Sequence, residues 1–143
     1  MQFITFILVY PIVKLLSKLP LRILYILSDV LYLLIFYVFK YRKKVVLDNL
    51  MIAFPENSLA ENKHYSKYFF KHLTDLFIET IKAISIIKSE IVKRYQYTNP
   101  ELVSNLLKEG KSIIFIGAHQ ANWEWSVNSP LVINSKVYGA YTS

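Results

Sequence analysis

Apolar residues dominate the start of the chain, and basic residues divide them into two segments. Residues 1–13 carry no charge, and residues 23–39 carry only Asp29. As a helix, the second segment extends about 25 Å, slightly less than the ~30 Å hydrocarbon core of a bilayer. The order of basic, apolar and small residues does not fit a cleavable signal peptide. The pattern therefore predicts a retained hydrophobic membrane anchor over residues 1–40, interrupted at Pro11 and Pro20.

Asp29 predicts how the second apolar segment packs. A carboxylate that faces lipid at mid-bilayer costs about 2.5–3.5 kcal/mol. On a helix, the polar and aromatic side chains of this segment share one stripe, formed by Arg22, Tyr25, Asp29, Tyr32 and Phe36. We expect this stripe to face protein or water, with Asp29 paired to Arg22 or to a tyrosine. The alternative is a groove that conducts lipid.

Residues 41–143 have the periodicity of a folded domain. Residues 45–53 predict a short helical or extended stretch that ends before Pro55. Ser58 and Glu61 have the spacing of a capping box and predict the start of a long amphipathic helix. Its expected core stripe recurs at steps of three and four residues: Phe69, Leu73, Leu76, Phe77, Thr80, Ile84 and Ile87.

The last third of the chain predicts helices that alternate with strands. Pro100 and Gly110 suit the first position of a helix and the residue beyond its end. Residues 112–117 are short, apolar and rich in β-branched side chains, which indicates a buried strand, and residues 136–141 are a weaker strand candidate. A helix that stops near Pro130 is expected between them. This order predicts an α/β fold with a parallel sheet.

The amino-acid composition excludes several classes of protein. The chain has 17 Lys and Arg against 10 Asp and Glu, a net charge of +7, and no cysteine, which excludes a disulfide scaffold, a cysteine zinc site and a thiol nucleophile. The basic residues flank the apolar segments, which favours an anionic lipid surface over nucleic acid. A basic cluster directly follows the second segment and predicts that the rest of the chain is cytoplasmic: Lys40, Arg42, Lys43 and Lys44.

One short segment has the residues for catalysis, and it follows the predicted strand at residues 112–117. His119 is placed where α/β folds carry active sites, and an imidazole is a usable base near neutral pH. Glu124, five residues later, can accept a hydrogen bond from the imidazole and stabilise its protonated form. Since no serine or cysteine nucleophile accompanies them, the pair suits proton abstraction from an incoming alcohol that then attacks an activated acyl carbonyl.

One other interpretation of this segment stays open. His119 and Glu124 can form a purely structural pair in a small, non-enzymatic membrane protein, with Trp123, Trp125 and Tyr138 at the membrane interface. A metal site is not expected, because only two ligands lie close together and their spacing is not that of a helix-borne zinc pair.

The segment Gly117-Ala-His-Gln-Ala-Asn-Trp-Glu124 resembles the His-x4-acid block of the bacterial late acyltransferases of lipid A biosynthesis, within the lysophospholipid acyltransferase superfamily. Residues 41–56, which include the Tyr-Arg-Lys-Lys and Phe-Pro-Glu sequences, resemble a second family block, and residues 79–82 also fit. The likeness runs from about Leu19 to the C-terminus. Two departures are Ala121, where the family usually has glycine, and Thr142, where it commonly has Arg or Lys.

This resemblance implies an enzyme of the bacterial inner membrane, with an acyltransferase-type α/β sandwich domain on the cytoplasmic face. It would move a fatty acyl chain from the thioester of acyl carrier protein to a hydroxyl of a lipid A precursor, with no other cofactor. His119 would be the general base and Glu124 its orienting acid, while Asn122 and Trp123 would shape the substrate site. A lysophospholipid, an ornithine-type lipid or another hydroxylated lipid is an alternative acceptor.

The family implies more strands and helices than residues 1–143 predict. An open sheet edge at residues 136–141 would be prone to aggregation. We therefore expect the chain to be a fragment that holds the base and the first half of the α/β domain.

Overall fold

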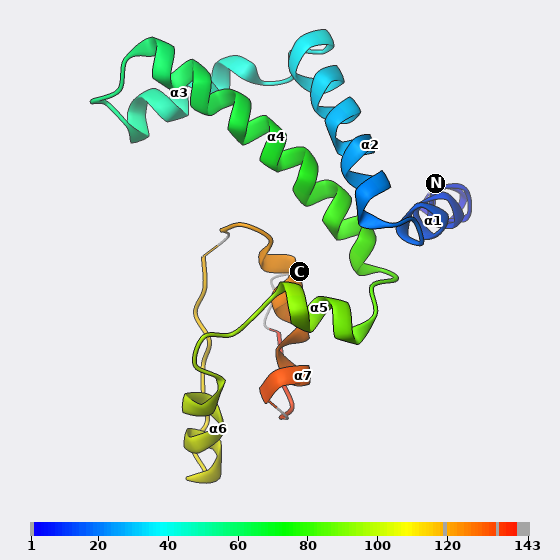
Figure 1. The fold of residues 1–143 in the computed structure, drawn as a ribbon, viewed down its shortest axis with the longest axis vertical. Helices are drawn as coiled ribbons and strands as arrows, with labels where there is room; N and C mark the ends of the chain where they lie inside the picture. The colour runs from blue at the N-terminus through cyan, green and yellow to red at the C-terminus, as the bar shows by residue number, and fades with distance from the viewer. Residues whose placement is uncertain (1, 119, 134, 140–143) are drawn as a thin grey trace. The chain divides into compact units, whose positions relative to one another are not determined.

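Helices form all the regular secondary structure in the part of the chain that the computed structural model describes, residues 2–118, 120–133 and 135–139 (Figure 1). The chain divides into two compact units, Met1–Ser85 and Ile86–Ser143. The first unit contains α1 (Gln2–Ser17), α2 (Leu21–Leu33), a π-helical continuation η1 (Leu34–Val38), α3 (Lys43–Ala53) and α4 (Leu59–Ala83). The second unit contains α5 (Lys88–Arg94), α6 (Pro100–Lys108), the 3₁₀ helix η2 (Trp123–Asn128) and α7 (Ser129–Ile133).

The two apolar segments at the N-terminus form separate helices. Pro11 lies inside α1, so the interruption expected there is wrong. A proline removes one N–H donor and crowds the preceding turn, but α1 continues past it. The break falls instead after Ser17, whose hydroxyl donates to the carbonyl of Lys14 at 2.8 Å. Pro20 directly precedes α2, as its fixed φ favours. Among the residues that the structure describes, one helical span, Leu21–Val38, is long and apolar enough to cross a membrane.

The start of α4 confirms the capping box. The backbone N–H of Glu61 donates to the Ser58 hydroxyl at 3.3 Å, and the Ser58 N–H donates to the Glu61 carboxylate at 2.8 Å. Hydrogen bonds from the Ser58 hydroxyl and backbone lower the pKa of Glu61. The helix before it, α3, ends at Ala53, next to Phe54-Pro55, as predicted.

The long helix α4 is the spine of the first unit, and α1, α2 and α3 all pack against it (Figure 1). Its buried face is not the predicted apolar stripe, since Phe69, Phe77 and Ile84 are exposed. Four-residue steps define the buried face instead: Asn62, Ser66, Phe70, Thr74 and Ile78. Three of these are small or polar, which lets neighbouring helices approach closely, and the Thr74 hydroxyl is satisfied by the Lys71 carbonyl at 2.8 Å.

The predicted α/β fold is wrong for the described residues. Residues 112–117 and 136–139 form neither strands nor a sheet, and residues 140–141 lie outside the described part of the chain. The side chains of Ile114 and Ile116 are 86% and 94% exposed. A strand is stabilised by hydrogen bonds to a neighbouring strand, so β-branched residues without such a neighbour do not form a sheet.

Local helix signals in the second unit were more accurate. Pro100 is the first residue of α6, and Gly110 follows the helix with φ +76°, a conformation that glycine adopts without strain. The helix expected near residues 122–131 is present as η2 and α7. It does not stop at Pro130, which lies in the first turn of α7, where a proline costs no hydrogen bond.

Candidate functional site

The predicted catalytic segment leads into η2. His119 lies outside the described residues, so the distance between its imidazole and Glu124 stays untested. Glu124 is half-buried in the first turn of η2, where a carboxylate complements the positive end of a helix. Asn122 directly precedes η2 and is half-buried, whereas Trp123 is exposed at the first helical position. The structure therefore gathers Asn122, Trp123 and Glu124 at one helix start.

Ala121 has a backbone conformation that glycine adopts more readily. Its φ is +47°, in the left-handed region, where a Cβ atom costs about 1–2 kcal/mol. This residue stands where the resembling family usually has glycine. The left-handed turn gives a physical reason for that glycine, because it redirects the chain between Ala118 and the start of η2.

Tyr97 supports η2 from outside the motif. Its hydroxyl donates to the backbone carbonyl of Ser126 at 3.0 Å, across 29 residues of sequence. Trp125 is only 5% exposed and fixes the helix in the second unit, where α5 and α7 contact η2. This burial removes Trp125 from the interfacial aromatic belt that the non-enzymatic interpretation requires. Sequence reasoning missed Tyr97, since nothing local links it to residue 126.

Burial also sets the protonation of Tyr97. Removal of the phenol from water raises the pKa of Tyr97 above its ordinary value, against the opposing effect of a hydrogen bond with Ser129. A phenol is already neutral near neutral pH, and the raised pKa extends to higher pH the range in which Tyr97 can donate to Ser126. Tyr97 is a hydrogen-bond donor here, not a base.

A cavity of about 720 Å³ lies in the second unit, and part of its lining, residues 111–115, comes just before the motif in the sequence. Its walls come from α6 and from the two predicted strands: Val103, Leu107, Ile113, Phe115, Val137 and Tyr138 are among them. The two segments expected to form strands thus line one apolar space. The apolar lining contributed by these segments agrees with their apolar sequence, whereas the predicted burial in a sheet is wrong.

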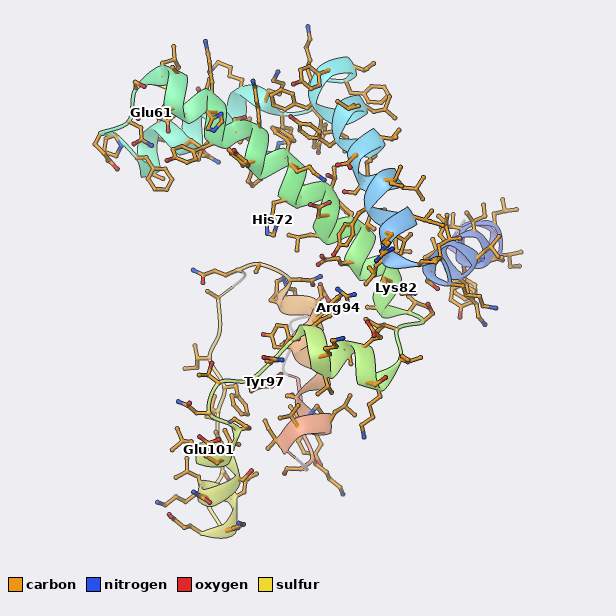
Figure 2. All side chains as sticks on the ribbon, viewed as in Figure 1. Glu61, His72, Lys82, Arg94, Tyr97 and Glu101 are labelled. Atoms are coloured by element: carbon orange, nitrogen blue, oxygen red, sulfur yellow. The ribbon has the colours of Figure 1, made fainter. Side chains whose placement is uncertain are left out.

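Glu79 and Lys82, from the third segment that resembles the family, hold the N-terminal helices. The hydroxyl of Tyr25 in α2 donates to the Glu79 carboxylate at 2.6 Å. The Lys82 ammonium donates to the carbonyls of Ser17 and Leu19, each at 3.0 Å, at the elbow between α1 and α2 (Figure 2). A cation at these carbonyls also complements the negative end of α1.

Asp29 faces both protein and water, in agreement with the expectation of protein or water, but its partner differs from the prediction. It forms an ion pair with Lys71 of α4, and Lys71 also contacts Asp75 at 3.3 Å. Burial alone would lower the pKa of Lys71, but its hydrogen bonds to the two carboxylates outweigh burial and leave the pKa raised. The Ser28 hydroxyl completes this cluster by donating to Asp75 at 2.6 Å.

No group of three or more His, Asp or Glu side chains that could hold a metal ion is found in the residues that the structure describes. The features present are apolar N-terminal helices, basic residues at their ends and a half-buried acid that starts a helix after a histidine-containing segment. Together these features indicate a membrane-associated protein.

The family can be stated directly. The chain belongs to the bacterial lipid A biosynthesis acyltransferases, whose family model matches residues 1–133. This match confirms the resemblance seen in the sequence and covers the segments at residues 41–56, 79–82 and 117–124. No curated protein and no solved structure matches the chain.

Proposed function

We propose that the chain transfers a fatty acyl group from the thioester of acyl carrier protein to a hydroxyl of a lipid A precursor, at the cytoplasmic face of the bacterial inner membrane. The observation that carries this proposal is the family match over residues 1–133, which includes the whole His-x4-Glu segment. The partners implied are acyl carrier protein, the lipid acceptor and the membrane, with no nucleic acid and no metal.

In this proposal His119 is the general base. An imidazole nitrogen takes the proton of the acceptor hydroxyl. At the same time, the hydroxyl oxygen forms a bond to the thioester carbonyl carbon. The tetrahedral intermediate then expels the carrier thiolate, which receives the proton from the imidazolium and leaves as a thiol. The acyl group ends as an ester, and His119 returns to its neutral form.

Glu124 is the positioning acid of the same step. A carboxylate on the other imidazole nitrogen selects the tautomer that can accept a proton and stabilises the charge that develops. The start of η2 suits this role, because Trp125 and Tyr97 hold the helix that carries Glu124. Asn122 and Trp123 flank Glu124 and are proposed to shape the entry for substrate.

The test measures transfer from radiolabelled acyl carrier protein to a panel of lipids by membranes that contain the chain. The panel includes a lipid A precursor, a lysophospholipid and an ornithine-type lipid. His119→Ala and Glu124→Gln are compared with Glu101→Gln, which changes a carboxyl on α6 outside the motif.

We expect transfer to the lipid A precursor, with a loss of about 10²- to 10⁴-fold for His119→Ala. Glu124→Gln should lower the rate, and Glu101→Gln should leave it unchanged. Transfer that survives His119→Ala would remove the proposed base. Transfer to another lipid alone would retain the mechanism and replace the acceptor. Because the chain is expected to be a fragment, it is assayed alone and within a full-length extension, and no transfer by either would refute the proposal.

A further inference from the structure

The helix that is long enough to cross a membrane has two different faces. One face of α2 and η1 packs on α4 through Leu24, Ser28 and Phe36, which are buried. The other face is an exposed apolar stripe with helical spacing: Ile23, Ile26, Leu27, Val30, Leu33, Leu34, Tyr37 and Val38. A spanning helix surrounded by lipid would be apolar on all sides, whereas the face toward α4 also carries polar groups, the Tyr25 and Ser28 hydroxyls and the Asp29 carboxylate.

Contacts with α4 follow this helix along its length. Phe36 and Phe70 lie 5.4 Å apart between ring centres, Ser28 contacts Asp75, and Tyr25 contacts Glu79. At the far end, Lys82 binds the elbow before α2 (Figure 2). If α2 crossed the bilayer in this arrangement, the part of α4 from Phe70 to Lys82 would cross beside it.

That part of α4 is poorly suited to hydrocarbon. It carries Lys71, Asp75, Glu79 and Lys82, and each charged side chain at the bilayer centre costs about 2.5–3.5 kcal/mol on insertion scales. Asp29, near the middle of the span, is the partner of Lys71, and its side chain is 57% exposed. A spanning position would place this half-exposed ion pair at mid-bilayer, whereas a position at the membrane surface leaves it in water.

Helix α1 adds a second exposed apolar surface. Basic residues lie at both ends of the continuous helix formed by α2 and η1. The exposed apolar residues of α1 include Phe6, Leu8, Ile12 and Leu15. Exposed basic side chains stand at the elbow and after η1: Lys14, Lys18, Arg22, Lys40, Arg42 and Lys44. Apolar faces edged by basic residues are the pattern of helices that lie in an anionic lipid surface.

We propose that α1 and the continuous helix formed by α2 and η1 lie in one leaflet of an anionic membrane, with the exposed apolar surface of α1 and the apolar stripe of α2 and η1 in the acyl region and α4 on the aqueous side. The long helix α4 prevents α2 from crossing. Lys82 fixes the elbow on the same side of the membrane as α4. This placement concerns topology alone and does not depend on the acyl acceptor or on catalysis.

Cysteine labelling tests the topology directly, because the chain has no native cysteine. Lys18→Cys reports the elbow and Lys44→Cys reports the residues after η1; both positions are exposed. A membrane-impermeant maleimide is applied to sealed right-side-out and inverted membrane vesicles, with detergent-opened vesicles as the full-labelling reference. We expect both cysteines to react in the same type of vesicle. Reaction of the two from opposite sides would show that α2 crosses and would overturn the proposal.

A depth measurement tests the lipid contact. A fluorescent label is attached to three single-cysteine variants, Ile26→Cys, Val30→Cys and Leu34→Cys. Each is added to vesicles of phosphatidylethanolamine and phosphatidylglycerol. The acyl chains of these lipids are brominated either near the headgroup or near the methyl end. A helix that lies in one leaflet predicts the same strong quenching by the shallow bromines at all three positions. Lys63→Cys, on the exposed part of α4, is the control and should not be quenched.

The other outcomes contradict the proposal. Deep quenching with a maximum at residue 30 indicates a spanning helix. Absence of quenching, together with energy transfer between labelled chains that rises with protein concentration, indicates that a second copy of the chain covers the stripe.

Discussion

The two units of this chain differ in how they use their apolar residues. In the first unit, α4 collects three neighbouring helices, and the buried contacts join residues distant in sequence, such as Ser28 and Asp75, which are 47 residues apart. In the second unit, residues 112–117 keep β-branched side chains such as Ile116 on the surface. The first unit therefore has a core of specific helix contacts, whereas the second supports its functional segment through a few contacts around η2.

This difference bears on function. The first unit fixes the apolar helices that are proposed to meet lipid, through Lys82, Glu79 and the cluster around Lys71. The second unit carries the segment proposed for catalysis, and Tyr97 and Trp125 hold its helix. Substitutions in the two units should accordingly separate effects on folding and membrane position from effects on the motif.

The largest effect is expected at the centre of the first unit. Phe70 is 1% exposed, and Phe70→Ala should lower the free energy of unfolding by about 3–5 kcal/mol, since it removes a buried ring and leaves a cavity. The matched truncation in the second unit, Ile116→Ala, should change it by less than about 0.5 kcal/mol. Urea unfolding in detergent micelles, followed by circular dichroism, measures both. Equal losses would show that Ile116 is covered and would remove the contrast.

Lys82→Met tests the link between α4 and the elbow. The substitution keeps the length of the side chain but removes the donor to two carbonyls, and a hydrogen bond to a charged group contributes about 1.5–3 kcal/mol. We expect a loss of about 2 kcal/mol and faster amide exchange in α1, measured by hydrogen–deuterium exchange. Lys67→Met, on the exposed side of α4, is the control. Unchanged exchange in α1 would show that Lys82 does not hold the elbow.

The parts of the fold that were predicted correctly are those with a local signal. Ser58 and Glu61 satisfy each other across three residues, and Pro100 and Gly110 act through their own backbone preferences. The buried stripe of α4 depends on which helices pack against it, and the sequence of α4 alone favoured the more apolar side. Asn62, Ser66 and Thr74 are buried because neighbouring helices approach there, which no local pattern records.

Long-range partners explain the remaining errors. Asp29 was placed correctly against protein because an unpaired carboxylate is costly in an apolar segment, but the choice of Lys71 required the fold. Residues 112–117 have strand propensity, and propensity alone does not supply a neighbouring strand. In the candidate site, the start of η2 at Asn122 and Glu124 agrees with the expected helix, whereas Tyr97 was beyond local reasoning.

Tyr97→Phe sharpens the comparison in the second unit. It removes the donor to the Ser126 carbonyl and should cost about 1 kcal/mol, measured by unfolding followed through tryptophan fluorescence. Because burial raises the pKa of Tyr97, its contribution is complete below the ordinary tyrosine pKa of about 10 and is lost as pH rises through the raised value. The difference between wild type and variant should therefore shrink in strong alkali.

Tyr95→Phe is the control for this experiment, since its ring lies 5.4 Å from the Tyr97 ring, and its change in stability should be smaller. A difference between wild type and Tyr97→Phe that stays constant through the alkaline range would contradict the assigned role of the phenol proton.

The smallest effect is expected at Ala121, and its sign is opposite. With φ at +47°, Ala121→Gly removes the Cβ strain of the left-handed region and should stabilise the second unit by about 0.5–1 kcal/mol. Ala118→Gly, three residues earlier and without a positive φ, should destabilise by a few tenths of a kcal/mol through the flexibility that glycine adds to the unfolded chain. Thermal unfolding of the two variants measures the difference in sign. If Ala121→Gly and Ala118→Gly destabilise the protein equally, the folded chain does not have the left-handed turn before η2. The physical reason given for glycine at this position of the family would then also be wrong.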